Sequence, residues 1–137
     1  MSKDIYVVIE QRNGAVQKVS YELISEATKL AADLRKPERF EGIHFFNPVY
    51  AMKLVEVIKG DATSEATMDA ARAFVESIRK EHVTILKDAP GFIVNRINFA
   101  TYAESFRVME EGVASIEDID KAIRLGLNHP MGPFELT

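Results

Sequence analysis

The sequence predicts an α/β fold in two parts, a small α/β layer followed by an all-α segment. Two observations support this prediction. Over residues 1–87, short runs rich in β-branched residues alternate with stretches whose apolar residues recur at helical spacing. After Pro90-Gly91 the strand signals end and only helical spacing remains. We therefore expect a partial α/β domain at residues 1–87 and a partial helical domain at residues 88–137.

The start of the chain, residues 1–34, predicts a strand, a hairpin and a helix. Residues 5–9 form an apolar run with β-branched side chains, which is typical of a buried strand. Asn13-Gly14 is a strong hairpin signal, and residues 15–19 would form the return strand. Residues 21–34 place their apolar side chains on one stripe, which indicates an amphipathic helix.

The next two predicted strands bring a histidine opposite a glutamate. Residues 42–46 and 53–58 both read as short strands. If they fold back symmetrically about Tyr50, His44 lies directly opposite Glu56. Directly opposed residues of an antiparallel pair have Cβ atoms roughly 5 Å apart.

Such a pair has two interpretations, and the spacing alone leaves both open. The neighbours of His44 and Glu56 are mostly apolar, so the carboxylate would hold the imidazole in one tautomer. That arrangement can act as a general acid/base unit. A core histidine satisfied by a nearby carboxylate would give the same pattern, and from spacing alone this structural case is the more frequent one.

The α/β part should end with one more helix and one more strand. Thr63 or Ser64 can cap a helix that runs to about Lys80, and residues 83–86 should form the strand. The apolar residues of this helix recur at helical spacing, so we expect them to face inward: Met68, Ala71, Phe74, Val75 and Ile78.

Two helices are expected beyond Pro90, a residue that suits the first turn of a helix. The first, residues 91–111, is apolar nearly all round and should be buried on more than one side. Ser115 with Asp118 three residues on is close to a capping box, and Gly126 should stop the second helix. Because little chain follows to cover the first helix, we expect a homo-oligomer, a two-fold dimer, through the helices beyond Pro90.

Composition narrows the classes of function. The 137 residues, 47% apolar and 28% charged, suffice for one modest core. The net charge of −4 does not suggest a nucleic acid or an anionic membrane as partner. The absence of cysteine excludes disulfides and thiolate metal sites, and the three histidines are not at metal-ligand spacing, so no metal is expected. Lacking both a signal-peptide pattern and a long apolar run, the chain is expected to be cytoplasmic.

About the last hundred residues resemble the short-chain 3-hydroxyacyl-CoA dehydrogenases, including the 3-hydroxybutyryl-CoA enzymes. The resemblance is specific because several long motifs fall in the family's order and spacing. These motifs are RKPERF at 35–40, HFFNPVYAMKLVEV at 44–57, DAPGFIVNRI at 88–97 and EEGVASIEDIDKAIRLGLNHPMGPFEL at 110–136.

This resemblance implies NAD as cofactor and an acyl-CoA as substrate. The family oxidises a 3-hydroxyacyl-CoA to the 3-ketoacyl-CoA in fatty acid and butyrate metabolism. Its fold would be a Rossmann-like sheet followed by a helical domain of the 6-phosphogluconate dehydrogenase C-terminal-like type. By the same resemblance His44 is the acid/base on the 3-hydroxyl, and Glu56 orients it. Asn47 would contact the nicotinamide side of the cofactor, and Asn95 would line the substrate pocket, although it can equally cap a helix start.

The chain departs from that family at its start. No Gly-rich dinucleotide motif follows the first strand, where the sequence reads EQRNG at 10–14. Residues 1–34 resemble instead the N-terminus of the electron transfer flavoprotein alpha subunit. The chain thus looks like a splice near Leu34-Arg35, with a truncated dehydrogenase part and an incomplete sheet. We expect negligible NAD binding and no dehydrogenase turnover by this chain alone.

Two other functions stay open at this point. The chain could be a non-catalytic helical association module that pairs with itself or with a full-length dehydrogenase. It could also be an electron transfer flavoprotein alpha fragment that carries the dehydrogenase part, although the sequence holds no flavin motif. An intact nucleotide cleft would favour the enzyme over the association module.

Overall fold

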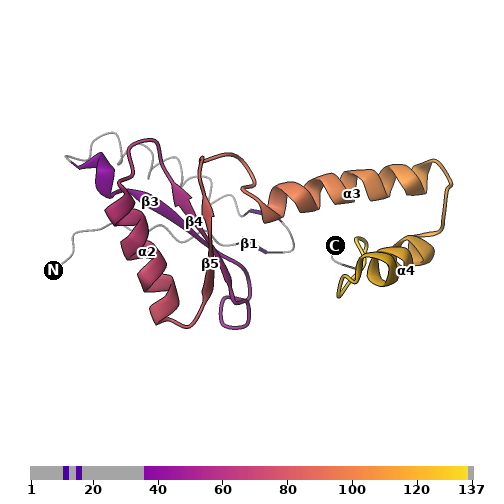
Figure 1. The fold of residues 1–137 in the computed structure, drawn as a ribbon. Coiled ribbons are helices and arrows are strands. Elements are labelled where there is room, and N and C mark those ends of the chain that lie inside the picture. Colours follow the sequence, from indigo (N-terminus) through magenta and orange to yellow (C-terminus); the bar gives the residue numbers. More distant parts are fainter. Residues whose placement is uncertain (1–10, 13–14, 17–35, 136–137) are drawn as a thin grey trace. The chain divides into compact units, whose positions relative to one another are not determined.

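The computed structural model describes residues 11–12, 15–16 and 36–135, in two compact units, Met1–Ala89 and Pro90–Thr137 (Figure 1). Among the described residues, the first unit contains five strands, the 3-10 turn η1 (Pro37–Arg39) and one helix. The described part of the second unit, residues 90–135, contains two helices. The strand expected at residues 5–9 and the helix expected at residues 21–34 lie outside the described residues.

The two shortest strands form a separate ladder. β1 (Gln11–Arg12) and β2 (Ala15–Val16) pair antiparallel, with Gln11 opposite Val16 and Arg12 opposite Ala15. This pairing flanks the Asn13-Gly14 signal and agrees with the return of the chain expected there.

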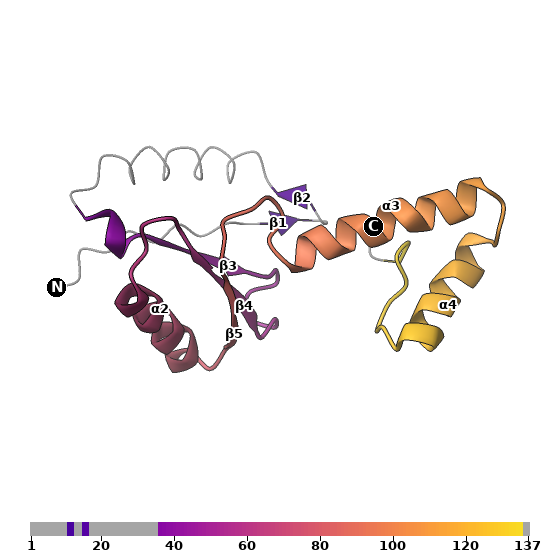
Figure 2. The same ribbon diagram turned by 45° about the horizontal axis from the view of Figure 1, so that its top comes forward.

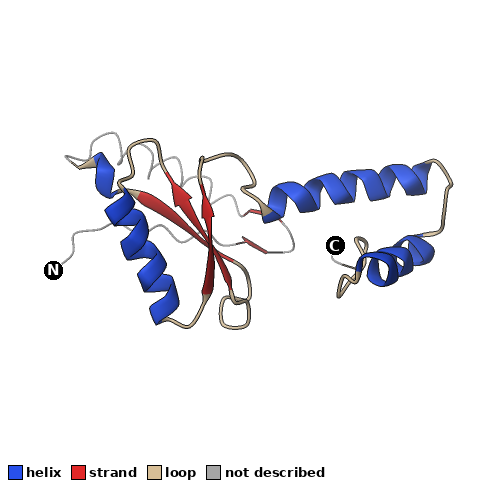
Figure 3. Ribbon diagram, in the orientation of Figure 1, coloured by secondary structure: helices blue, strands red, loops and turns tan. Residues whose placement is uncertain are grey.

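The central sheet of the first unit has three strands in the order β3-β4-β5 (Figure 3). β3 (Glu41–Phe45) and β4 (Leu54–Lys59) run antiparallel, whereas β4 and β5 (Glu81–Ile85) run parallel. The sequence of β4, LVEVIK, is rich in β-branched residues, and four of its six side chains are buried. The α/β class expected for this part is therefore confirmed.

One helix, α2 (Glu65–Ser77), makes the crossover that two parallel strands require and lies along one face of the sheet (Figures 1 and 2). Its N-cap is Ser64, whose hydroxyl accepts a hydrogen bond from the Thr67 N–H at 3.2 Å, one of the two caps expected. The core between helix and sheet consists of six buried apolar residues: Ile43, Val55, Val57, Met68, Ala71 and Val75.

The inward face predicted for α2 is wider than the face that the structure buries. Phe74 and Ile78 are 42% and 41% exposed, so the prediction that both face the core is wrong. The reason is geometric, because α2 meets the sheet along a narrow stripe made of Met68, Ala71 and Val75, which leaves the other two apolar positions exposed. The helix also ends at Ser77, before Lys80.

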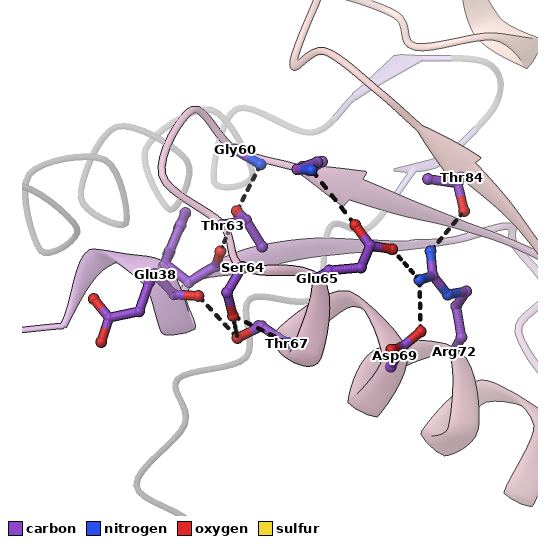
Figure 4. A network of polar contacts seen from close by, with 11 residues as sticks. Glu38, Gly60, Thr63, Ser64, Glu65, Thr67, Asp69, Arg72 and Thr84 are labelled. Atoms are coloured by element: carbon purple, nitrogen blue, oxygen red, sulfur yellow. Dashed lines mark hydrogen bonds and ion pairs between the residues drawn. The ribbon is translucent and has the colours of Figure 1, made fainter.

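The start of α2 is fastened to η1 and to the beginning of β3 (Figure 4). The Glu38 carbonyl accepts hydrogen bonds from the Ser64 N–H and the Thr67 hydroxyl, both at 2.8 Å. The Thr63 hydroxyl donates to the Phe40 carbonyl at 2.5 Å. These bonds satisfy backbone groups on both sides of the junction and fix where β3 enters the sheet.

The second unit begins with an irregular turn before its first helix, α3 (Val94–Glu110). Gly91 and Phe92 have φ values of 80° and 45°, which a right-handed helix cannot accommodate. Pro90 therefore lies outside the first turn, and the expected start at residue 91 is wrong. Ser105 is the buried residue of α3, so the expected burial on more than one side is also not found.

The second helix of this unit is α4 (Ile116–Leu127). Its predicted cap is confirmed, because the Ser115 hydroxyl accepts a hydrogen bond from the Asp118 N–H at 3.1 Å. Gly126 lies inside the helix, contrary to the prediction. Asn128, whose φ is 56°, supplies the left-handed residue that ends it, a role that asparagine can take in place of glycine.

The connector after α4 folds back onto that helix. The buried Asp120 carboxylate accepts a hydrogen bond from the Phe134 N–H at 2.9 Å. A Cβ on Gly132 would overlap the Asp120 side chain, so this approach requires glycine. The Phe134 ring meets the Phe106 ring of α3 edge-on, with centroids 5.1 Å apart. The connector thus joins α3 and α4 within the second unit.

Candidate active site

The structure brings His44 and Glu56 together. The two residues are directly opposite each other in the β3–β4 ladder, and His44 Nδ1 lies 2.7 Å from Glu56 Oε2. The side chains are 1% and 0% exposed, respectively. The predicted pairing and the predicted burial of Glu56 are therefore confirmed, and the catalytic role of the pair stays a prediction.

Strand alternation explains where this pair lies. Ile43 on β3 and Val55 and Val57 on β4 belong to the core beneath α2. Their neighbours His44 and Glu56 must therefore point to the opposite face of the sheet. A hydrogen bond of this length in such a buried place fixes the ring orientation and favours the tautomer that carries the proton on Nδ1.

An aromatic ring flanks the imidazole. Phe46, the residue after β3, has its ring centroid 4.8 Å from that of His44, with the planes inclined by 54°. This contact packs the ring from a second direction, in addition to the Glu56 carboxylate. The Glu56 carboxylate and the Phe46 ring thus both help to set the orientation of His44.

Asn47, the expected cofactor contact, lies in the turn between β3 and β4. Its side chain is exposed, and the Asn47–Pro48 peptide bond is cis. The turn closes through the Pro48 carbonyl, which accepts hydrogen bonds from the N–H groups of Ala51 and Met52, both at 3.0 Å. Asn47 therefore stands at the carboxyl end of the strand that carries His44.

Asn95, the expected substrate contact, is the second residue of α3 and belongs to the second unit. Its side chain is half-buried. The structure thus assigns the four predicted site residues to two units, with His44, Asn47 and Glu56 in the first and Asn95 in the second.

One residue that the sequence did not single out also meets this region. The Lys80 ammonium donates to the carbonyls of Val49 and Met52 in the β3–β4 turn. Lys80 is far from both in sequence, so no local pattern could have indicated the contact.

One pKa shift concerns the start of α2. The Arg72 guanidinium donates to the Glu65 carboxylate and lowers the pKa of that group (Figure 4). Within residues 36–135 and the short described segments before them, no group of three His, Asp or Glu side chains could hold a metal ion. No helix in the described part is long and apolar enough to cross a membrane.

Two family models match the chain in succession. The NAD binding domain of 3-hydroxyacyl-CoA dehydrogenase matches residues 24–89, and the C-terminal domain of the same enzymes matches residues 91–137. The first match begins before the expected junction at Leu34-Arg35. The two matches therefore indicate the class of two-domain dehydrogenases whose first domain binds NAD.

Individual relatives agree with both matches. The 3-hydroxybutyryl-CoA dehydrogenase of Bradyrhizobium diazoefficiens is 50% identical over 110 residues, which are 80% of this chain and 37% of that protein. The human mitochondrial hydroxyacyl-coenzyme A dehydrogenase is 49% identical over 111 residues, 81% of this chain and 35% of that protein. The crystal structure of (S)-3-hydroxybutyryl-CoA dehydrogenase from Ralstonia eutropha has a TM-score of 0.73 at 48% identity, over 80% of this chain and 38% of that one.

These findings place the chain within one family. Through residues 24–89 and 91–137 it belongs to the 3-hydroxyacyl-CoA dehydrogenase family. It spans little more than a third of the length of the curated relatives described above.

Proposed function

We propose that the first unit carries the acid/base pair of an NAD-dependent 3-hydroxyacyl-CoA dehydrogenase. The observation that supports this proposal is the buried 2.7 Å contact between His44 Nδ1 and Glu56 Oε2 on facing strands. The family match raises this interpretation above that of a merely structural pair. The substrate would be a 3-hydroxyacyl-CoA and the product the 3-ketoacyl-CoA.

The geometry assigns a task to each side chain of the pair. Glu56 engages Nδ1, so Nε2 is the ring nitrogen that would take the proton of the substrate's 3-hydroxyl as the carbonyl forms. The resulting imidazolium would be stabilised by the adjacent carboxylate. In the reverse direction the same nitrogen would return the proton to the 3-keto oxygen. NAD, when bound, supplies the acceptor for the hydride that leaves the carbon bearing the 3-hydroxyl.

Among the described residues, Asn47 fits one end of that cofactor. Asn47 is exposed at the carboxyl end of β3, where an amide can hydrogen-bond a nicotinamide carboxamide. At residues 10–14 the sequence has one glycine and an acidic side chain, where a pyrophosphate requires backbone N–H groups and no negative charge. We therefore propose that the pair is complete and that the nucleotide site is not.

A hybrid enzyme tests the proposed function. Residues 36–135 would replace the corresponding stretch of the Bradyrhizobium diazoefficiens relative, which supplies the remaining length. We expect NADH oxidation with acetoacetyl-CoA, and a kcat lower by about 10²–10⁴-fold in His44→Ala. His82→Ala is the matched control, because His82 pairs with the largely exposed Glu76 and should leave kcat unchanged. A folded hybrid without turnover, or one indifferent to His44→Ala, would refute the proposal.

A second candidate function is self-association through the helical unit. Three large side chains of α3 support it, because Ile97, Phe99 and Phe106 are 61%, 54% and 45% exposed. We propose a two-fold homodimer through this helix. Ile97→Asp should then yield a monomer in light scattering at tens of micromolar, whereas Asn98→Asp, with the same charge one residue on, should not. A monomeric unmodified chain would refute the dimer.

We also propose a cytoplasmic location and no nucleic-acid or membrane partner. The lack of cysteine suits a reducing compartment, and the net charge of −4 favours neither kind of polyanion. Cell fractionation tests the location, and recovery of the chain in a secreted or membrane fraction would contradict it.

A further inference from the structure

The way in which α2 ends fixes the backbone position of Lys80. Arg79 has a φ of 60°, and its N–H donates to the Glu76 carbonyl at 2.9 Å. The Lys80 N–H donates to the Val75 carbonyl at 3.2 Å. This is the Schellman pattern of helix termination, with Arg79 in the left-handed position. Because these bonds fix its backbone, Lys80 leaves the helix in a defined direction as the residue immediately before β5.

The Lys80 side chain crosses to the turn between β3 and β4. Its Nζ lies 2.5 Å from the Val49 carbonyl oxygen and 2.6 Å from the Met52 carbonyl oxygen. The next residue supports the same turn, because the Glu81 N–H donates to the Lys53 carbonyl at 3.0 Å. Carbonyl groups of three turn residues are therefore held from the segment that follows α2.

An ammonium group suits this task. It offers three donors and no acceptor, and it can serve two carbonyls at once. Hydrogen bonds from a charged donor are stronger than those between neutral groups. The Val49 and Met52 carbonyls lie outside the β3–β4 ladder, and the Lys80 ammonium supplies each with a donor.

We propose that Lys80 is a positioning residue, whose ammonium holds the β3–β4 turn and so fixes Asn47 at the end of the dyad strand. Asn47 precedes the Pro48 carbonyl that closes the turn, and a change in the turn would move its side chain relative to His44. The effect of Lys80 on cofactor binding rests on the proposed function, because it requires that a nicotinamide binds at Asn47. The effect of Lys80 on the turn rests only on its hydrogen bonds to the Val49 and Met52 carbonyls.

Amide hydrogen exchange on the full chain tests the structural part. Lys80→Met keeps the length of the side chain and removes the donors. We expect exchange at Ala51 and Met52, whose N–H groups close the turn, to accelerate about tenfold, and exchange at Val57 and Ala71 in the core to change less than about twofold. Lys87→Met, at an exposed lysine with no side-chain bond to the turn, is the matched control and should leave all four amides unchanged.

The outcomes separate positioning from general stability. Equal acceleration at all four amides, or none at Ala51 and Met52, would overturn the proposal. If Lys80→Met does not fold, the unmodified chain decides, because nuclear magnetic resonance should detect couplings across the hydrogen bonds from Lys80 Nζ to the Val49 and Met52 carbonyls. Absence of both couplings at low temperature, with the Lys80 ammonium signal observed, would overturn it as well.

Kinetics of the hybrid enzyme test the part that concerns cofactor. With Lys80→Met we expect the KM for NADH to rise about tenfold while kcat falls less than about threefold, because a misplaced Asn47 weakens binding more than it affects the proton transfer. An unchanged KM in an active hybrid would overturn the cofactor role alone. A hybrid that is inactive even with Lys80 would count against the proposed function, and the exchange experiment would still decide the role in the turn.

Discussion

The contact between His44 and Glu56 predicts a large energetic coupling that a double-mutant cycle can measure. The bond is 2.7 Å long and both side chains are almost fully buried. A hydrogen bond to a charged group contributes about 1.5–3 kcal/mol net, and each truncation also loses packing of about 0.8 kcal/mol per buried methylene. We therefore expect His44→Ala and Glu56→Ala each to lower the free energy of unfolding by about 2–4 kcal/mol.

The double variant should lose the shared bond only once. The sum of the two single losses in unfolding free energy should then exceed the loss in the double variant by about 1.5–3 kcal/mol. The assay is urea unfolding followed by circular dichroism, with the unfolding slope m compared between variants to exclude a change in the unfolded state. Domains of this size are stable by about 5–15 kcal/mol, so single variants that cost about 2–4 kcal/mol still unfold in a measurable transition.

The pair formed by His82 and Glu76 is the internal control. Its nitrogen–oxygen distance is 3.2 Å, and Glu76 is 67% exposed. Exposed pairs of this kind contribute about 0.2–1 kcal/mol, so its cycle should show a coupling several times smaller. A coupling for His44 and Glu56 that is no larger than this control would refute the account of the dyad as one buried unit.

Three further predictions concern the framework of the site. Met68→Ala, at a fully buried position, should cost about 2–5 kcal/mol in urea unfolding, and Phe74→Ala, on the exposed side of the same helix, should cost less. Gly112→Ala should lower stability by about 1–2 kcal/mol, measured in the melting of α3. The φ of Gly112 is 68° and an added Cβ would meet no other atom, so the cost comes from the backbone conformation alone. An unchanged stability would contradict that conformation. Arg72 lowers the pKa of Glu65, so the contribution of Glu65 is complete above its ordinary value of 4.5 and is lost as pH falls through the lowered pKa. The stability difference between the unmodified chain and Glu65→Gln should therefore shrink on acidification below that value, and a difference independent of pH would count against the ion pair.

The sequence was sufficient to predict the strand register that pairs His44 with Glu56, because two local signals agree. The symmetric placement of His44 and Glu56 about Tyr50, with a turn signal between the strands, leaves one pairing that buries the apolar residues of both. The observed ladder has this pairing. The cap at Ser115 was equally predictable, whereas for α2 the sequence left Thr63 and Ser64 open and the structure has Ser64.

The errors arose where tertiary structure decides against local pattern. The exposure of Phe74 and Ile78 depends on how α2 packs against the sheet, which the sequence of the helix does not contain. The left-handed residue that ends α4 is Asn128 and not Gly126, although both residue types are compatible with the local signal. The contacts of Lys80 join residues about thirty positions apart, and no periodicity reports such a bond.

The central claim is that the acid/base pair is complete in this chain and the nucleotide site is not. Its most direct test is the rate of NADH oxidation with acetoacetyl-CoA by the unmodified 137-residue chain, measured beside its His44→Ala variant. Positioning of the nicotinamide supplies much of the barrier reduction, so we predict that the two rates are equal. A rate clearly above that of His44→Ala would contradict the account, because it would show that residues 1–34 complete a working nucleotide site.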